Sequence, residues 1–135
     1  MLEYFNPPTL YKSSIYSHAV KGSGRIIFVA GQCSHQPQGE SVKNPEIIHK
    51  ADPYGQARQC HLNVKYALEA AGASLKDVVK INTYSTHPDF RTILIDLRKE
   101  FFPEPPYPAS TGVVVTALFD PHAMFEIEVV AIVED

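Results

Sequence analysis

The C-terminal stretch Pro108–Asp135 constrains the fold more than any other part of this sequence. It contains two apolar runs separated by a polar break at Asp120–His122, a pattern that predicts two strands. Strand alternation gives the second run one wholly apolar face, while Glu126 and Glu128 stand at the head of the other face. Because that second face is otherwise apolar, the strand is expected to be covered on both sides. The two carboxylates therefore need partners or a solvent-filled cleft, although the face could simply be exposed to solvent where the strand begins.

The first part of the chain predicts an irregular lead-in followed by a β-hairpin. Residues 1–12 are rich in Pro, Asn and Tyr and are expected to lack regular structure. Ser13–Val20 and Arg25–Cys33 predict two strands, and the turn signal at Lys21–Gly24 joins them as a hairpin. Gly31, inside the second of these strands, indicates either a bulge or a place where a ligand approaches the backbone closely.

Two helices alternate with strands in the remainder of the chain. Asp52-Pro53 predicts the start of the first helix and Gly72 its end, with an apolar stripe between them. Val78–Thr86 predicts a strand, and a second helix lies between His87 and Pro103. The order β-β-α-β-α-β-β predicts one α/β (α+β) domain over residues 1–135, with a mixed sheet and both helices on one face.

Helices on one face leave the other face of the sheet uncovered. Its apolar side chains would include Ile26, Phe28, Val113 and Val115, and self-association is the simplest way to cover them.

Composition excludes several classes of function. The net charge of −3 gives no footprint for nucleic acid. No window is long enough to span a membrane, and the N-terminus lacks a signal-peptide pattern, so a cytoplasmic location is expected. The histidines are scattered, so no metal site is expected, and His61 is interpreted as a satisfied histidine beside the helical stripe. Cys33 and Cys60 are expected to be thiols, with Cys33 more typical of core filler than of a nucleophile.

Three phrases of the chain resemble the Rid family, the reactive-intermediate deaminases that are also called YjgF-like or L-PSP proteins. They are GRIIFVAGQ, GQARQCHLNVKYALEAAGASLKDVVKINTY and YPAST with FEIEVVAI, and the similarity runs from about Tyr16 to Ile132. The resemblance implies a chorismate-mutase-like fold, a homotrimer and ligand clefts between adjacent subunits. It also implies hydrolysis of reactive enamines and imines, such as 2-aminoacrylate, to 2-keto acids and ammonia without a cofactor.

The resemblance also assigns roles to individual residues. Glu126 matches the glutamate that orients or activates the hydrolytic water, and Tyr16 matches a cleft tyrosine. Ala30 replaces a cleft serine, and Ser110 replaces the arginine that grips the substrate carboxylate. The substrate-binding candidates are Tyr16, Ala30, Gly31, Phe90, Ser110 and Thr111.

Ser110 is the most informative departure from the family pattern. A guanidinium clamp contributes about 1.5–3 kcal/mol per charged hydrogen bond, and one neutral hydroxyl cannot replace it. Amino-acid-derived imines are therefore expected to bind poorly unless another cation reaches the cleft, and Ser110→Arg is expected to recover them. Arg91 is a candidate for that cation, although an exposed helix arginine is the more ordinary interpretation. His18 could also face the cleft.

Two functions follow from this pattern of retained and lost residues. The first is a cofactor-free hydrolase or deaminase of a small enamine or imine, with a substrate range altered by Ser110 toward less charged or larger compounds. The alternative is a non-catalytic trimer of the same fold that binds a small metabolite or acts in regulation. The long loop 34–51 is expected to cover part of the molecule in either case.

Overall fold

The computed structural model describes residues 1–36 and 46–135. The centre of the loop expected to cover part of the molecule thus lies outside the described residues. Two short 3₁₀ turns, Leu75–Asp77 and Pro88–Phe90, accompany the regular elements. The helices and strands are, in chain order, β1 (Glu3–Phe5), β2 (Ala19–Lys21), β3 (Arg25–Gln32), α1 (Pro53–Ala70), β4 (Val78–Ser85), α2 (Arg91–Phe101), β5 (Ala109–Val114) and β6 (Phe125–Val133).

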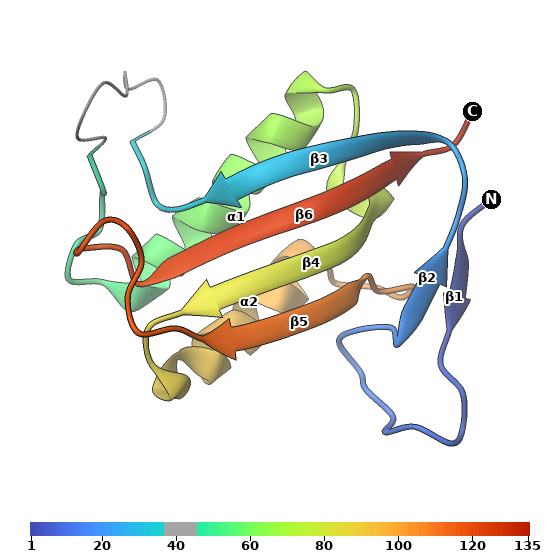
Figure 1. Cartoon of the computed structure of the whole chain (residues 1–135), viewed down its shortest axis with the longest axis horizontal. Helices are drawn as coiled ribbons and strands as arrows, with labels where there is room; N and C mark the ends of the chain where they lie inside the picture. Colours follow the sequence, from blue (N-terminus) through green and yellow to red (C-terminus); the bar gives the residue numbers. More distant parts are fainter. Residues whose placement is uncertain (37–45) are drawn as a thin grey trace.

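The main sheet has four strands in the order β3-β6-β4-β5, and both helices lie on one of its faces (Figure 1). Strand β6 runs antiparallel to β3 and β4, whereas β4 and β5 are parallel. The predicted α+β fold with a mixed sheet is thereby confirmed. The two closing strands β5 and β6 are not neighbours, because β4 lies between them.

The hairpin predicted for the first part of the chain is wrong. Strand β2 pairs antiparallel with β1 in a separate two-stranded sheet, and it does not pair with β3. The lead-in expected to be irregular thus supplies a strand. Gly24 has a φ of +142°, a conformation that favours glycine, and a Cβ there would lie 2.3 Å from the carbonyl oxygen of Val133. The turn therefore directs the chain from the small sheet into β3 instead of folding it back on β2.

Helix α1 has the predicted ends. The side chain of Asp52 accepts a hydrogen bond from the Gly55 amide at 3.0 Å, which caps the first turn. After the helix, Gly72 has a φ of +77° and turns the chain toward β4. No helix of the described residues has both the length and the hydrophobicity needed to cross a membrane.

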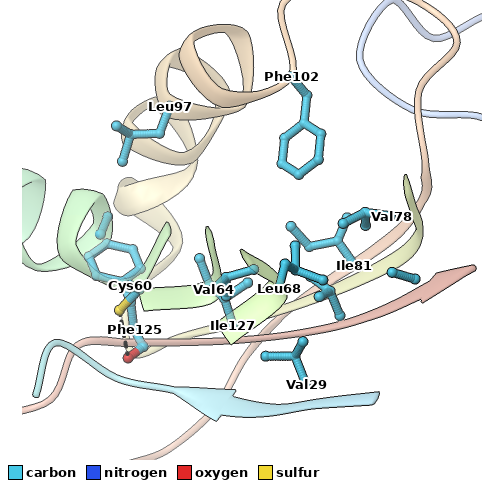
Figure 2. Packing of buried hydrophobic residues seen from close by; sticks show 13 residues of the cluster. Val29, Cys60, Val64, Leu68, Val78, Ile81, Leu97, Phe102, Phe125 and Ile127 are labelled. Atoms are coloured by element: carbon cyan, nitrogen blue, oxygen red, sulfur yellow. Dashed lines mark hydrogen bonds between the residues drawn. The ribbon is translucent and has the colours of Figure 1, made fainter. Parts of the chain in front are cut away.

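The core fills the space between the helices and the sheet (Figure 2). Phe125, Ile127 and Val129 of β6 are buried there against Cys60, Val64 and Leu68 of α1. The thiol of Cys60 donates to the carbonyl oxygen of Phe125 at 3.7 Å. The wholly apolar face predicted for β6 is confirmed as the face that packs on the helices.

The other face of the sheet carries exposed apolar side chains. Phe28 is 79% exposed, Ile26 57% and Val113 44%. Alternation along β6 places Glu126 and Glu128 on this same face. We call it the open face, because no helix of the described residues covers it.

Candidate functional site

A cleft of about 410 Å³ lies along β5, where this edge strand meets α2. Its polar side chains come from four separate segments and are Tyr16, Thr83, Ser85, Arg91, Arg98 and Ser110. Its apolar walls are formed by Ile15, Pro88, Leu94, Ile95, Val113 and Val114. A small organic molecule with one polar end and an apolar remainder suits such a lining.

A backbone contact brings Tyr16 to this cleft. The amide of Ser17 donates to the carbonyl oxygen of Pro108 at 3.0 Å, and Ser17 forms a parallel bridge with Ala109. The segment before β2 therefore runs along the outer edge of β5, and Tyr16 lines the same cleft as Ser110. The ring of His18 packs edge-on against Tyr16, with 5.2 Å between centroids, and does not line the cleft.

Arg98 of α2 also lines the cleft, and the sequence did not predict it there. Its guanidinium Nη1 donates to Ser110 Oγ at 3.1 Å, and Nη2 lies 3.5 Å from Thr83 Oγ1. The side chain is only 6% exposed, and the guanidinium carbon lies 5.9 Å from the centroid of the Phe102 ring. A cation thus stands beside Ser110, and it is Arg98, whereas the sequence offered Arg91 as the candidate. Arg91 also lines the cleft but is exposed.

The charge of Arg98 is not balanced within the described part of the chain. No carboxylate there lies within 4.0 Å of the guanidinium, and its Nε has no hydrogen-bond partner among those residues. Burial lowers the pKa of Arg98 to about 10. An unpaired buried cation costs free energy, because its hydration is lost without a compensating charge.

On the open face, Glu126 lies against Gly31 of β3. The register of β3 and β6 shifts between Val29 and Gln32, so the bulge predicted at Gly31 is confirmed. A Cβ at Gly31 would lie 2.8 Å from the carboxyl carbon of Glu126, so a larger residue there would require the end of the Glu126 side chain to shift. The thiol of Cys33 donates to Glu126 Oε1 at 3.3 Å.

Cys33 is suited to support Glu126 and not to attack a substrate. It is buried with Ile47 and Ala123 in a small apolar cluster. Burial raises the pKa of its thiol to about 12, and the neighbouring charge of Glu126 acts in the same direction. The thiol therefore stays protonated and donates its hydrogen, in agreement with the core-filler interpretation.

Glu128 differs from Glu126 in having two strong partners. Its Oε1 accepts from the Tyr84 hydroxyl at 2.6 Å and from the Asn82 side-chain amide at 3.2 Å. This cross-strand pairing between β4 and β6 explains the second carboxylate as part of the sheet. Glu126 is left as the carboxylate without such a structural role.

The predicted site residues fall into two groups on opposite faces of the sheet. Tyr16 and Ser110 lie in the cleft on the helix side. Gly31 and Glu126 lie together on the open face, where Ala30 is also exposed. Since a sheet separates them, one chain cannot bring both groups to the same small molecule.

Two further candidates have other contacts. Thr111 Oγ1 accepts from Lys80 Nζ at 2.8 Å and does not line the cleft. The Phe90 ring packs against Phe125, with 5.1 Å between centroids, and also lies outside the lining.

His61 was expected at the edge of the α1 stripe and is instead fully inside, at 2% exposure. Its Nδ1 lies 2.7 Å from the Ala57 carbonyl oxygen and must donate to it, whereas Nε2 has no partner among the described residues. Burial, together with a smaller contribution from the charge of Arg98, lowers the pKa of His61 to about 4. The ring is therefore neutral near pH 7, and only half of its hydrogen-bonding capacity is satisfied.

Comparison with known proteins identifies the family. The sequence pattern of the family described as Endoribonuclease L-PSP matches residues 9–133, so the chain belongs to this family. The RutC family protein YjgH of Escherichia coli K12 is 35% identical over 127 residues, covering 91% of this chain and 86% of that protein. The 2-iminobutanoate/2-iminopropanoate deaminase of Dermatophagoides farinae is 33% identical over 119 residues, covering 88% of this chain and 86% of the relative.

Solved structures give the same result. YyfB from Yersinia pestis, a Rid-family protein of unknown function, superposes with a TM-score of 0.82 at 31% identity and covers 98% of both chains. Escherichia coli TdcF with bound serine superposes with a TM-score of 0.70 at 30% identity and covers 91% of both chains. The resemblance to the Rid proteins is confirmed.

Proposed function

We propose that this protein is a cofactor-free, deaminase-type hydrolase of a small enamine or imine, acting in a cleft between the subunits of a homotrimer. An enamine first becomes the imine by gaining a proton at carbon and losing one from nitrogen. Water then adds to the carbon of the C=N bond, and the C–N bond breaks to release ammonia and a carbonyl compound. The deaminase-named relatives, among them one that is 33% identical, support this class of reaction.

The setting of Glu126 is the observation that carries the proposal. The carboxylate is held against Gly31, and no cation of the described residues lies within 4.0 Å of it. A carboxylate that is fixed in place but not neutralised can accept a proton from an attacking water as a general base.

The separation of the site residues supports a trimer. Tyr16 and Ser110 face the helix side of the sheet, whereas Glu126 faces the open side. A second copy that placed its cleft against the open face would bring the two groups together and would cover the exposed Phe28 and Ile26. Both requirements are met by one association of identical chains.

A panel of imines and enamines generated in situ tests this function through release of ammonia and carbonyl product. Glu126→Gln should lower turnover by roughly 10²–10⁴-fold, as expected for loss of a general base. Glu128→Gln is the matched control, because it changes a carboxylate two residues away on the same strand, and it should keep most of the activity. Equal turnover by the wild-type protein and Glu126→Gln would refute the assigned role.

The departures at Ala30 and Ser110 favour one alternative, a trimer that binds a small metabolite without converting it. This alternative predicts saturable binding with no ammonia after prolonged incubation. RNA is a weaker candidate ligand despite the family's description, because a net charge of −3 offers no attraction for a phosphate backbone.

A further inference from the structure

The burial of the charged Arg98 side chain is not explained by a contribution to the stability of the fold. It is buried on the helix side of the sheet, and the groups that it contacts are two neutral hydroxyls and an aromatic ring. Buried charges in proteins are normally paired, because removing them from water is costly. An apolar residue of similar volume would fill the same space without that cost. The arginine is therefore expected to have an anionic partner outside its own chain.

We propose that Arg98 is the specificity-determining residue of the cleft and that it binds the carboxylate of a small substrate. This inference rests on the proposed function and names the substrate class: enamines or imines that carry a carboxylate and an otherwise apolar body. It reverses the sequence-based expectation that Ser110 selects less charged compounds.

The donors needed for a carboxylate are present at this position. A guanidinium carries five N–H groups in a planar fork. Two of its nitrogens point to Ser110 and Thr83, and Nε has no partner among the residues that the structure describes. Because Ser110 Oγ accepts from Arg98, its own proton is free to donate to the same anion. The serine and the arginine together can thus do what a single clamp would do.

The lining favours a single negative charge on a mostly apolar ligand. Arg98 is the one buried cation of the cleft, and the exposed Arg91 lies toward solvent. The walls contributed by Leu94, Ile95 and Val114 are apolar. A phosphate group with a double charge would need further buried donors, whereas a carboxylate on a short aliphatic chain matches both parts of the cleft.

Binding of stable compounds tests the assignment without relying on turnover. The probes are 2-oxobutanoate and its neutral amide, titrated by calorimetry or followed by NMR. Wild-type protein should prefer the acid over the amide by at least about tenfold, the equivalent of one charged hydrogen bond. Arg98→Met should weaken binding of the acid by roughly 10- to 100-fold and leave the amide unchanged.

Lys99→Met is the matched control, since it removes the same charge from the next position of the same helix, where the side chain is exposed. It should bind both probes like the wild-type protein. If Arg98→Met does not fold, Arg98→Lys and Ser110→Ala replace it, and each should reduce the preference for the acid. Wild-type binding of the acid by any folded Arg98 variant, or no preference for the acid in the wild-type protein, would overturn the assignment.

Moving the guanidinium gives a second test. Ser110→Arg alone adds a second cation to a site for an anion, so it should bind the acid at least as well as the wild-type protein. The double variant Arg98→Ser with Ser110→Arg relocates the charge from α2 to β5 and should restore binding to within about tenfold of the wild-type protein. A double variant that binds the acid no better than Arg98→Ser alone would overturn the placement of the anion between these two positions.

The outcomes separate this inference from the proposed function. Selective binding of the acid without any turnover of the corresponding imines would support Arg98 as the anion-binding residue and refute the hydrolase. Turnover that depends on Glu126 but is insensitive to Arg98 and to the carboxylate would do the reverse.

Discussion

The two faces of the central sheet carry unpaired charges of opposite sign. On the helix side, Arg98 is a buried cation with no acid within 4.0 Å among the described residues. On the open side, Glu126 has no base within 4.0 Å among the same residues, and it shares its face with exposed apolar side chains. Under the proposed function, each face would hold one half of the groups that bind and hydrolyse a charged imine, and the functional unit would be larger than one chain.

The largest effect is expected from a variant that keeps the open face of one chain from meeting the cleft of another. Phe28→Asp puts a charge at the most exposed large apolar position of β3, and it should abolish self-association and reduce turnover to background. Light scattering should then show the 15.0 kDa chain instead of an assembly of three times that mass. Tyr66→Asp, on the exposed side of α1, is the control and should remain assembled and active. An active Phe28→Asp monomer would contradict the two-chain site.

Subunit complementation tests whether Arg98 and Glu126 of one site come from different chains. Arg98→Met and Glu126→Ala should each be nearly inactive on carboxylate-bearing imines. If the cleft of one chain meets Glu126 of another, refolding an equal mixture should regain up to about a quarter of the wild-type activity, since each site draws its two halves independently. Each variant refolded alone gives the baseline. A mixture that stays at this baseline would show that both residues act within one chain.

The smallest expected effect concerns the interior of the helix side. Burial lowers the pKa of His61 from 6.5 to about 4. The ring is therefore protonated below pH 6.5 in the unfolded chain but only below about pH 4 in the folded chain. The stability contributed by the neutral ring is thus present above pH 6.5 and lost as the pH falls toward 4. At pH 5 the loss relative to pH 7 amounts to about 2 kcal/mol.

His61→Leu should remove this loss, as measured by urea unfolding at pH 7 and pH 5 at a fixed protein concentration. The exposed His122→Gln should retain the wild-type dependence. If His61→Leu loses as much stability between these two pH values as the wild-type protein does, His61 is not the group responsible.

Local features of the chain were predictable, because their causes lie within a few residues. The cap at Asp52, the turn at Gly72 and the bulge at Gly31 all follow from side-chain chemistry at single positions. The apolar face of β6 follows from strict alternation. The burial of Arg98 had a visible signal as well, since it lies four residues after Leu94 in the apolar stripe of α2. An arginine in such a stripe either turns outward or has a function.

Strand partners were not predictable in the same way. Pairing of β2 with β1, and not with β3, depends on how segments distant in the sequence meet. The same holds for the insertion of β4 between β5 and β6, and for the contact of Ser17 with Pro108 that carries Tyr16 to the cleft. Alternation defines the two faces of a strand but carries no information about its neighbours.

Pro108–Asp135 shows which features the sequence determines and which depend on tertiary structure. Its residue pattern alone was enough to establish two strands and to place Glu126 and Glu128 on one face of the second strand. Only the tertiary structure distinguished these carboxylates, because the partners of Glu128 lie on β4 and the close neighbour of Glu126 lies on β3. Only the tertiary structure placed Arg98 against Ser110, because this contact joins a helix to a strand across the proline-rich segment between them. The sequence determines the chemistry of each side chain, whereas tertiary packing determines which other side chains it contacts.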